Sequence, residues 1–195
     1  MPDDQQVGRQ PLPPDSASFV APRSVIDRGL DAPAGEIEDG ATMKKLSLDE
    51  VPIRSGCGYP APFDLPCRDR KRWRLGAAAG LTQVGVNLLR LRPGAWSSQR
   101  HWHTEEDELV YVLEGEVTLV TDEGEEVLAA GDCAGFKAGD PNGHHLQNRT
   151  QREAVLLEIG TRRDADVTEY PEIDLRAIPA GYTHKDGRPY PESGG

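Results

Sequence analysis

Four side chains in two short segments could together bind a metal ion. His101 and His103 are separated by one residue, so on a β-strand both imidazoles point to the same face. Glu108 follows a short turn and opens the next strand, which we expect to return antiparallel beside the first. His144 begins a further strand after a loop rich in Gly, Pro and Asn. Three imidazoles and one carboxylate suit Fe(II), Mn(II), Ni(II), Zn(II) or Co(II), so these residues predict one divalent transition metal ion.

Two polar side chains are candidates for contact with a substrate beside that ion. Gln99 shares the strand face of His101 and His103, and Asn87 is a polar residue within an otherwise apolar strand. For both, local hydrogen bonding inside the protein is the alternative interpretation. An octahedral ion with four protein ligands keeps two positions for water or substrate, which a catalyst needs.

The elements that must position these side chains are short strands joined by tight turns. Across residues 81–160, the runs ELVYVL and EVTLVT flank Glu114-Gly115, which we interpret as a two-residue hairpin loop. The runs EVTLVT and EEVLAA flank the three-residue loop at 122–124, which ends in Gly. Regularly spaced strands without a convincing helix predict an all-β sandwich or barrel.

The rest of the chain divides around this core. Residues 1–42 are rich in proline and lack apolar periodicity, so we expect a disordered N-terminal extension, with Met43 as a plausible native start. Residues 43–80 are expected to supply the strands that lead into the barrel, residues 81–160 the barrel itself, and residues 161–195 an outer strand and tail.

At this point the sequence resembles a known family, the cupins, and in particular the small bacterial single-domain cupins. Their signature is Gly-X5-His-X-His-X3–4-Glu-X6-Gly, followed by Gly-X5-Pro-X-Gly-X2-His-X3-Asn. The matching positions here are Gly94, His101, His103, Glu108 and Gly115 in the first motif, and Gly131, Gly139, His144 and Asn148 in the second. The resemblance covers roughly residues 81–160. It implies a double-stranded β-helix, a jelly-roll-like barrel with the metal inside, and a likeness to sugar-phosphate-isomerase-like cupins.

The sequence departs from the signature at three places. Six residues rather than five follow Gly94 before the first histidine, Lys137 replaces the proline, and the loop before His144 is two residues longer. We still expect His144 to be the ligand because Asn148 follows it at the required distance. His145 would point the other way.

Basic residues alternate in the segment CRDRKRWRLG. On an extended strand, its four arginines would share one face; they are Arg68, Arg70, Arg72 and Arg74. We interpret the segment as a solvated edge strand, with the acidic run at 104–108 as a possible partner. The functional alternative is an anion site for a phosphorylated or carboxylated substrate, because guanidinium groups match such oxyanions.

Overall charge and composition exclude several classes of partner. A formal net charge of -11 argues against binding to nucleic acid or to anionic membranes. No run approaches the roughly 20 apolar residues that span a bilayer, and the first residues do not resemble a secretory signal. Cys57, Cys67 and Cys133 are too widely spaced for a disulfide framework, so reduced cysteines and a cytoplasmic location are expected.

Two classes of function remain open. The first is a metal-dependent enzyme, isomerase-like or dioxygenase-like, acting on a small polar or anionic metabolite. The second is a non-catalytic module that binds a small ligand or the metal. In either case we expect a homodimer that buries an apolar outer face containing Val86, Leu88, Leu109 and Tyr111.

Overall fold

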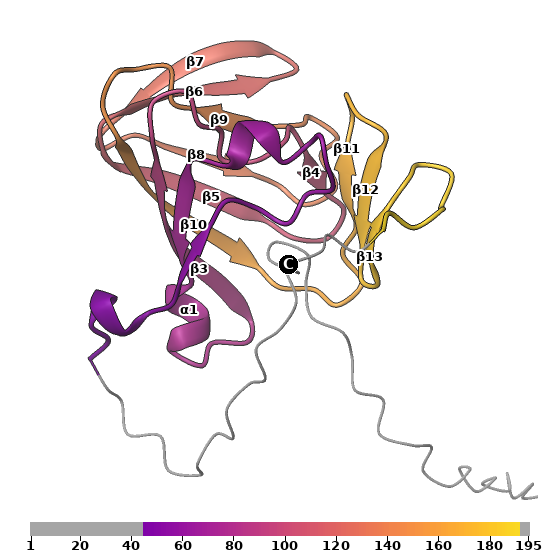
Figure 1. The fold of residues 1–195 in the computed structure, drawn as a ribbon, viewed down its shortest axis with the longest axis horizontal. Coiled ribbons are helices and arrows are strands. Elements are labelled where there is room, and N and C mark those ends of the chain that lie inside the picture. The colour runs from indigo at the N-terminus through magenta and orange to yellow at the C-terminus, as the bar shows by residue number, and fades with distance from the viewer. Residues whose placement is uncertain (1–44, 192–195) are drawn as a thin grey trace, which may run out of the picture.

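The computed structural model describes residues 45–191, and their regular secondary structure is almost entirely β-strand (Figure 1). The predicted N-terminal extension, residues 1–42, lies outside the described part. Helical structure in the described part is limited to three short turns: the 3-10 turns Leu48–Glu50 and Leu65–Cys67, and α1, Leu75–Ala78. None of these helices is long and apolar enough to cross a membrane. The all-β prediction is confirmed.

The largest sheet has six antiparallel strands in the order β1-β2-β3-β10-β5-β8. Its strands are β1 (Ile53–Ser55), β2 (Arg70–Trp73), β3 (Val84–Leu91), β10 (Ala154–Thr161), β5 (Glu108–Glu114) and β8 (Cys133–Phe136). Burial alternates along β3 because successive side chains of a strand point to opposite faces. One face of this sheet therefore lines the interior of the barrel and the other faces outward.

Two smaller sheets complete the barrel and its cover. The first has the order β7-β6-β9, and the second has the order β13-β12-β11-β4. Their strands are β7 (Gly124–Ala129), β6 (Glu116–Thr121), β9 (His145–Gln147), β13 (Gly181–Thr183), β12 (Leu175–Ile178), β11 (Thr168–Tyr170) and β4 (Trp102–His103). The hairpin predicted around residues 122–124 is present, but its loop has two residues rather than three, because Gly124 belongs to β7 and pairs with Thr121.

The predicted hairpin at Gly115 is wrong. Strand β5 pairs with β10 and β8, whereas β6 pairs with β7 and β9, so the chain changes sheets at this residue. Gly115 has φ of 79°, and a Cβ there would lie 2.9 Å from the carbonyl oxygen of Glu153. A glycine is required because any side chain would meet this backbone.

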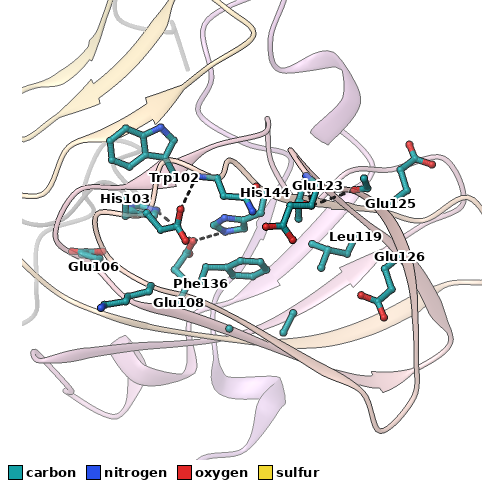
Figure 2. A pocket seen from close by; sticks show the side chains of 17 residues that line it. Trp102, His103, Glu106, Glu108, Leu119, Glu123, Glu125, Glu126, Phe136 and His144 are labelled. Atoms are coloured by element: carbon teal, nitrogen blue, oxygen red, sulfur yellow. Dashed lines mark hydrogen bonds and ion pairs between the residues drawn. The ribbon is translucent and has the colours of Figure 1, made fainter.

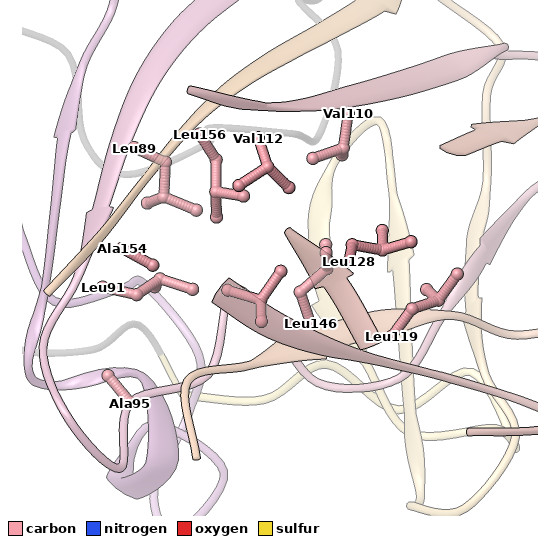
Figure 3. Close-up of a cluster of buried hydrophobic side chains, with 11 residues drawn as sticks. Leu89, Leu91, Ala95, Val110, Val112, Leu119, Leu128, Leu146, Ala154 and Leu156 are labelled. Atoms are coloured by element: carbon pink, nitrogen blue, oxygen red, sulfur yellow. The ribbon is translucent and has the colours of Figure 1, made fainter. Parts of the chain in front are cut away.

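The hydrophobic core fills the space between the six-stranded and three-stranded sheets (Figure 3). Its buried members are Leu89, Leu91, Ala95, Val110, Val112, Val117, Leu119, Leu128, Leu146, Ala154 and Leu156. A second apolar cluster contains Tyr59, Cys67, Tyr170, Leu175 and Ala177. These two clusters leave a polar region between them, and the candidate metal ligands lie there.

The arginine-rich segment is not the solvated edge strand that its charge predicted. Strand β2 lies between β1 and β3, and Arg70 and Arg72 are each only 6% exposed. Arg72 forms an ion pair with Glu158 of β10. The register explains this burial, because Arg70 and Arg72 lie opposite the interior residues Leu91 and Leu89 of β3.

Candidate metal centre

The four predicted ligands come from three segments of the chain: the His-X-His pair, the start of β5 and the residue before β9. His103 is the last residue of β4, and Glu108 is the first residue of β5. These two strands belong to different sheets, so the expected antiparallel pairing between them is not found. His101 and His144 form an isolated antiparallel bridge with backbone N–H···O bonds of 3.1 and 2.8 Å. This bridge is the reason that a histidine 43 positions along the chain reaches the His-X-His pair.

The three imidazoles converge on one carboxylate oxygen of Glu108. Glu108 Oε2 lies 3.4 Å from His101 Nε2, 3.6 Å from His103 Nε2 and 2.9 Å from His144 Nε2. Figure 2 shows the Glu108 carboxylate between the rings of His103 and His144, with Phe136 against His144. The Phe136 and His144 rings are parallel, with centroids 3.5 Å apart, which fixes the plane of that imidazole.

These separations fit the coordination sphere of a single ion. Nitrogen and oxygen ligands bind first-row metals at about 2.1 Å, so neighbouring ligand atoms lie about 3 Å apart in an octahedron and about 3.4 Å apart in a tetrahedron. The ligand atoms of His101, His103 and Glu108 all lie within 4.8 Å of one another. His144 is outside this group of three, although its Nε2 lies 2.9 Å from Glu108 Oε2. His103 Nε2 is buried and has no hydrogen-bond partner among the described residues. A metal ion that replaced the Nε2 proton would give this buried nitrogen a partner.

Two of the rings are oriented by bonds on their other nitrogen. His101 Nδ1 donates to the carbonyl oxygen of Gln99 at 2.9 Å, and His103 Nδ1 donates to Asp166 Oδ2 at 2.6 Å. Both bonds place the proton on Nδ1 and turn Nε2 toward Glu108. Such bonds to the far nitrogen are the usual support of histidine ligands.

Asp166 was not predicted from the sequence. Its side chain is buried, and its Oδ1 accepts from the backbone N–H of Glu105 at 2.9 Å and from Thr104 Oγ1 at 3.3 Å. It lies 63 residues after His103, in a polar connection before β11. Nothing in its local pattern distinguishes it from a surface aspartate, so only the folded chain reveals it.

The electrostatics of the cluster separate its groups at neutral pH. Burial would raise the pKa of Glu108, but the charge of His103 and bonds from His101 and His144 hold it well below its usual range. Burial disfavours protonated His103, yet the charges of Glu108 and Asp166 prevail and raise its pKa to about 9. Burial lowers the pKa of His144 to about 4. The metal-free cluster therefore contains an ionised carboxylate, a neutral His144 and a protonated His103.

Glu106, a member of the acidic run at 104–108, is also buried beside the cluster. It is 1% exposed, its Oε1 accepts from the backbone N–H of Arg163 at 2.7 Å, and its ligand atom lies within 4.8 Å of those of His103 and Asp166. Its burial follows from the turn that reverses the chain before Glu108. The acidic run therefore contributes a second buried carboxylate beside the cluster.

Two cavities adjoin the cluster, and both are lined by His103, Glu108 and His144. The larger has a volume of about 560 Å³. Acidic side chains predominate around it, as Figure 2 shows for Glu123, Glu125 and Glu126. The smaller, of about 60 Å³, lies on the side of β1 and β2. A bound molecule could therefore reach the cluster from the larger cavity and extend into the smaller one.

The two predicted substrate contacts lie elsewhere. Gln99 is buried and its Nε2 donates to the carbonyl oxygen of Phe63 at 2.6 Å, while Asn87 faces the barrel interior opposite Glu158. Neither residue lines either of the two cavities. His145 contacts the carbonyl oxygen of Ser98 through its Nδ1 at 3.1 Å, so its ring is directed away from Glu108.

Comparison with known proteins agrees with the resemblance of the motifs to cupins. A family described as the cupin domain matches residues 87–160. Among solved structures, a sugar phosphate isomerase of the cupin superfamily from Silicibacter pomeroyi is 46% identical, with a TM-score of 0.71; the match covers 76% of this chain and 97% of that one. A candidate sugar phosphate isomerase from Acidithiobacillus ferrooxidans is 34% identical, with a TM-score of 0.55, over 58% of this chain and 74% of that one. No curated protein matches this chain.

A third structure extends the comparison at the level of the fold alone. The polyketide cyclase RemF from Streptomyces resistomycificus is 19% identical, with a TM-score of 0.50, over 62% of this chain and 80% of that one. The barrel scaffold is thus shared with proteins whose named chemistry differs. Chemical function has to be argued from the site rather than from the barrel.

Proposed function

The chain belongs to the cupin superfamily, and we propose that it is a metal-dependent, isomerase-like enzyme acting on a small polar or anionic metabolite. One divalent transition metal ion, Fe, Mn, Ni, Zn or Co, is held by His101, His103, Glu108 and His144. The observation that supports this proposal is the convergence of three imidazole Nε2 atoms, at 2.9 to 3.6 Å, on Glu108 Oε2 beside a 560 Å³ cavity.

The residues of the cluster set the charge and the orientation of the proposed ligands. Glu108 supplies the anionic ligand, and His144 is neutral at neutral pH, so it adds no positive charge that would repel a metal ion. Asp166 retains the proton on His103 Nδ1 and so keeps Nε2 available. When bound, the ion would act as a Lewis acid on substrate oxygens and acidify a neighbouring proton. The larger cavity provides the space in which the substrate lies against these ligands.

An isomerase-like reaction is preferred to a dioxygenase-like one because of the two most similar structures cited above. Both are described as sugar phosphate isomerases or candidates for that activity, at 46% and 34% identity. The non-catalytic alternative, a module that binds a small ligand or the metal, predicts the same ligand geometry. Only turnover separates it from the enzyme.

The first experiment is elemental analysis of protein purified without a metal-affinity column. We expect about one first-row metal ion per chain in the wild type and its loss in the H101A/H103A double variant. His184→Ala is the matched control, because His184 pairs with Asp174 outside the cluster and should retain the metal. A wild type that stays metal-free after reconstitution would contradict the proposed ligand set.

The reaction class is then tested with the metal-loaded protein. Interconversion of aldose and ketose phosphates, followed by NMR, would support the isomerase-like proposal, whereas substrate-dependent oxygen consumption would replace it with a dioxygenase-like one. Tight retention of metal without either activity over a panel of sugar phosphates would favour the binding module.

We also propose that the protein is a homodimer located in the cytoplasm. The register of the large sheet places Val86 beside Ile159 and Leu109, and Leu88 beside Leu157 and Tyr111, on its outer face. Leu109 and Tyr111 are each 39% exposed, so this apolar surface is available to a second copy. Light scattering of the L109E/Y111E variant, which should be monomeric, tests the assembly.

A further inference from the structure

Three arginine side chains gather in the smaller cavity, on the opposite side from the acidic one. Arg54 comes from β1, and Arg70 and Arg72 come from β2. The same cavity is lined by His101, His103, Glu108 and His144, so it connects the guanidinium groups to the candidate metal ligands. The acidic side chains Glu123, Glu125 and Glu126 line only the larger cavity. The arginines therefore lie on one side of the histidine cluster, and these three glutamates lie on the other.

The register of the sheet brings like charges unusually close together. Arg54 lies directly opposite Arg72 in the antiparallel pair of β1 and β2. Like charges in directly opposed positions of a sheet are destabilising. Burial and the neighbouring charges of Arg70, Arg72 and Arg74 lower the pKa of Arg54. This is the direction expected where positive charges lie near one another. An unfavourable arrangement of this kind is expected where a bound anion compensates for it.

The lining of the smaller cavity carries more guanidinium groups than carboxylates. Arg72 is paired with Glu158, with Nη2 and Nε 2.8 Å from its two carboxylate oxygens. Arg70 donates to the carbonyl oxygens of Gly56 and Ser97, and among the described residues it forms no ion pair with a carboxylate. These bonds use two of its five N–H donors. The lining residues comprise three guanidinium groups and only two carboxylates, those of Glu108 and Glu158.

A purely structural role accounts for part of this arrangement. The two carbonyl bonds of Arg70 tie the loop before β2 to the segment before β4, and the Arg72–Glu158 pair links β2 to β10. Of the three arginines, Arg54 is the one on β1, at the partly exposed edge of the sheet.

The dimensions of the cavity limit what could bind there. A volume of about 60 Å³ corresponds to about two water molecules at about 30 Å³ each, which is the size of one small oxyanion group. Arg54, Gly58 and Tyr182 line the cavity and are all partly exposed, so it reaches the surface at this end. Burial raises the pKa of Tyr182 to about 12, so its hydroxyl remains a proton donor at neutral pH.

We propose that Arg54, Arg70 and Arg72 form an oxyanion-binding subsite for a phosphate or carboxylate group of the molecule that binds at the histidine cluster. This inference rests on the proposed function for the identity of that molecule as a substrate. It adds an orientation: the anionic group lies toward β1 and β2, and the uncharged part lies toward the larger, acidic cavity. Guanidinium groups suit this role because their planar donors match the oxygens of phosphate and carboxylate.

The test is isothermal titration calorimetry with inorganic phosphate and, separately, with acetate. Each anion is titrated into protein stripped of metal with a chelator and into zinc-loaded protein, because stripped protein offers no ion to which the anion could bind. The variants are Arg54→Gln and Arg54→Lys. Arg188→Gln is the matched control, since Arg188 is 73% exposed at its side chain and pairs with Asp186 away from both cavities.

We expect one anion per chain in the wild type and in the Arg188 control, and at least tenfold weaker affinity in Arg54→Gln. Arg54→Lys should be intermediate because it keeps the charge and loses the fork. Tighter binding of phosphate would identify a phosphate-bearing substrate, and tighter binding of acetate a carboxylate. The thermal unfolding of each variant without anion shows whether it is folded, and Arg54→Lys preserves the test if Arg54→Gln is not.

Two results would overturn the subsite: no anion binding by wild-type protein in either metal state, or equal affinity in wild type and both Arg54 variants. Failure of the proposed function gives a different outcome. If the protein holds no metal yet binds phosphate through Arg54, the subsite stands without the metal-dependent enzyme. If metal is retained but Arg54 has no effect, only the subsite is refuted.

Discussion

The substitution Asp166→Asn should weaken metal binding without unfolding the protein. Asp166 Oδ2 accepts the Nδ1 proton of His103 at 2.6 Å, while Oδ1 accepts from the backbone N–H of Glu105 at 2.9 Å. Asparagine has the same shape but one acceptor fewer. Whichever way its amide is turned, an NH₂ group faces an N–H donor. If it faces His103, the ring can relieve the conflict by moving its proton to Nε2, the atom that should bind the metal.

The size of the effect follows from this geometry. Loss of an outer partner of a histidine ligand typically costs 10- to 100-fold in metal affinity, which corresponds to about 1.4 to 2.7 kcal/mol. The negative charge of Asp166 also helps to hold the pKa of His103 at about 9. Its removal makes that proton easier to displace and offsets part of the loss at neutral pH. The larger loss is therefore expected above pH 9, where His103 is already neutral in the wild type.

The assay is competition for zinc against a chromophoric chelator at pH 7.5 and pH 9.5. Asp174→Asn is the matched control, because Asp174 accepts from His184 Nδ1 at 2.8 Å in an equivalent pair on the surface. This control should bind zinc as the wild type does. Thermal unfolding of the metal-free variants separates weakened binding from loss of structure. A folded Asp166→Asn protein within threefold of wild-type affinity at both pH values would refute the reasoning.

Three further predictions follow from the same structure. Metal binding at pH 7.5 should release about one proton per chain, because His103, whose pKa is raised to about 9, is protonated in the metal-free protein; the release should disappear above pH 10, and calorimetry in buffers of different ionisation enthalpy measures it. Leu156→Ala should lower the free energy of unfolding by about 2–5 kcal/mol, because Leu156 is fully buried in the main core. Leu113→Ala, at an exposed position of β5, should cost less than about 1 kcal/mol, and urea denaturation of the metal-free proteins compares the two. Gly115→Ala should destabilise by at least about 1 kcal/mol, since its φ is 79° and a Cβ would lie 2.9 Å from the carbonyl oxygen of Glu153; a midpoint of denaturation equal to that of the wild type would contradict this.

Strand content was predictable because it depends on local pattern, whereas strand pairing was not. The short runs rich in apolar residues, bounded by turn residues, identify β3 and β5 as strands. The runs on either side of Gly115 are also strands, but they belong to different sheets. A glycine between two strands is compatible with a hairpin and with a change of sheet, and long-range packing against β10 and β9 decides between them.

The arginine segment shows that local pattern also fails to predict whether a charged residue is buried. A strand with alternating arginines predicts exposure, because an isolated guanidinium strongly prefers water. The structure instead places Arg70 and Arg72 inside, where two backbone carbonyls and Glu158 satisfy them. Those partners are remote in sequence, so no local signal could have revealed them.

The sequence by itself determined the kind of chain this is and which residue types could bind a metal: an all-β cupin, with His101, His103, Glu108 and His144 at motif spacing. The strand content follows from the short-range pattern of strands and turns, and the family follows from the resemblance of the two motifs to the cupin signature. Only the tertiary structure decided which groups surround those ligands. Asp166 beside His103, and Arg54 opposite Arg72, are products of pairing between distant strands and loops. The physical reason is that orientation, burial and pKa depend on neighbours in space, which the order of residues along the chain does not specify.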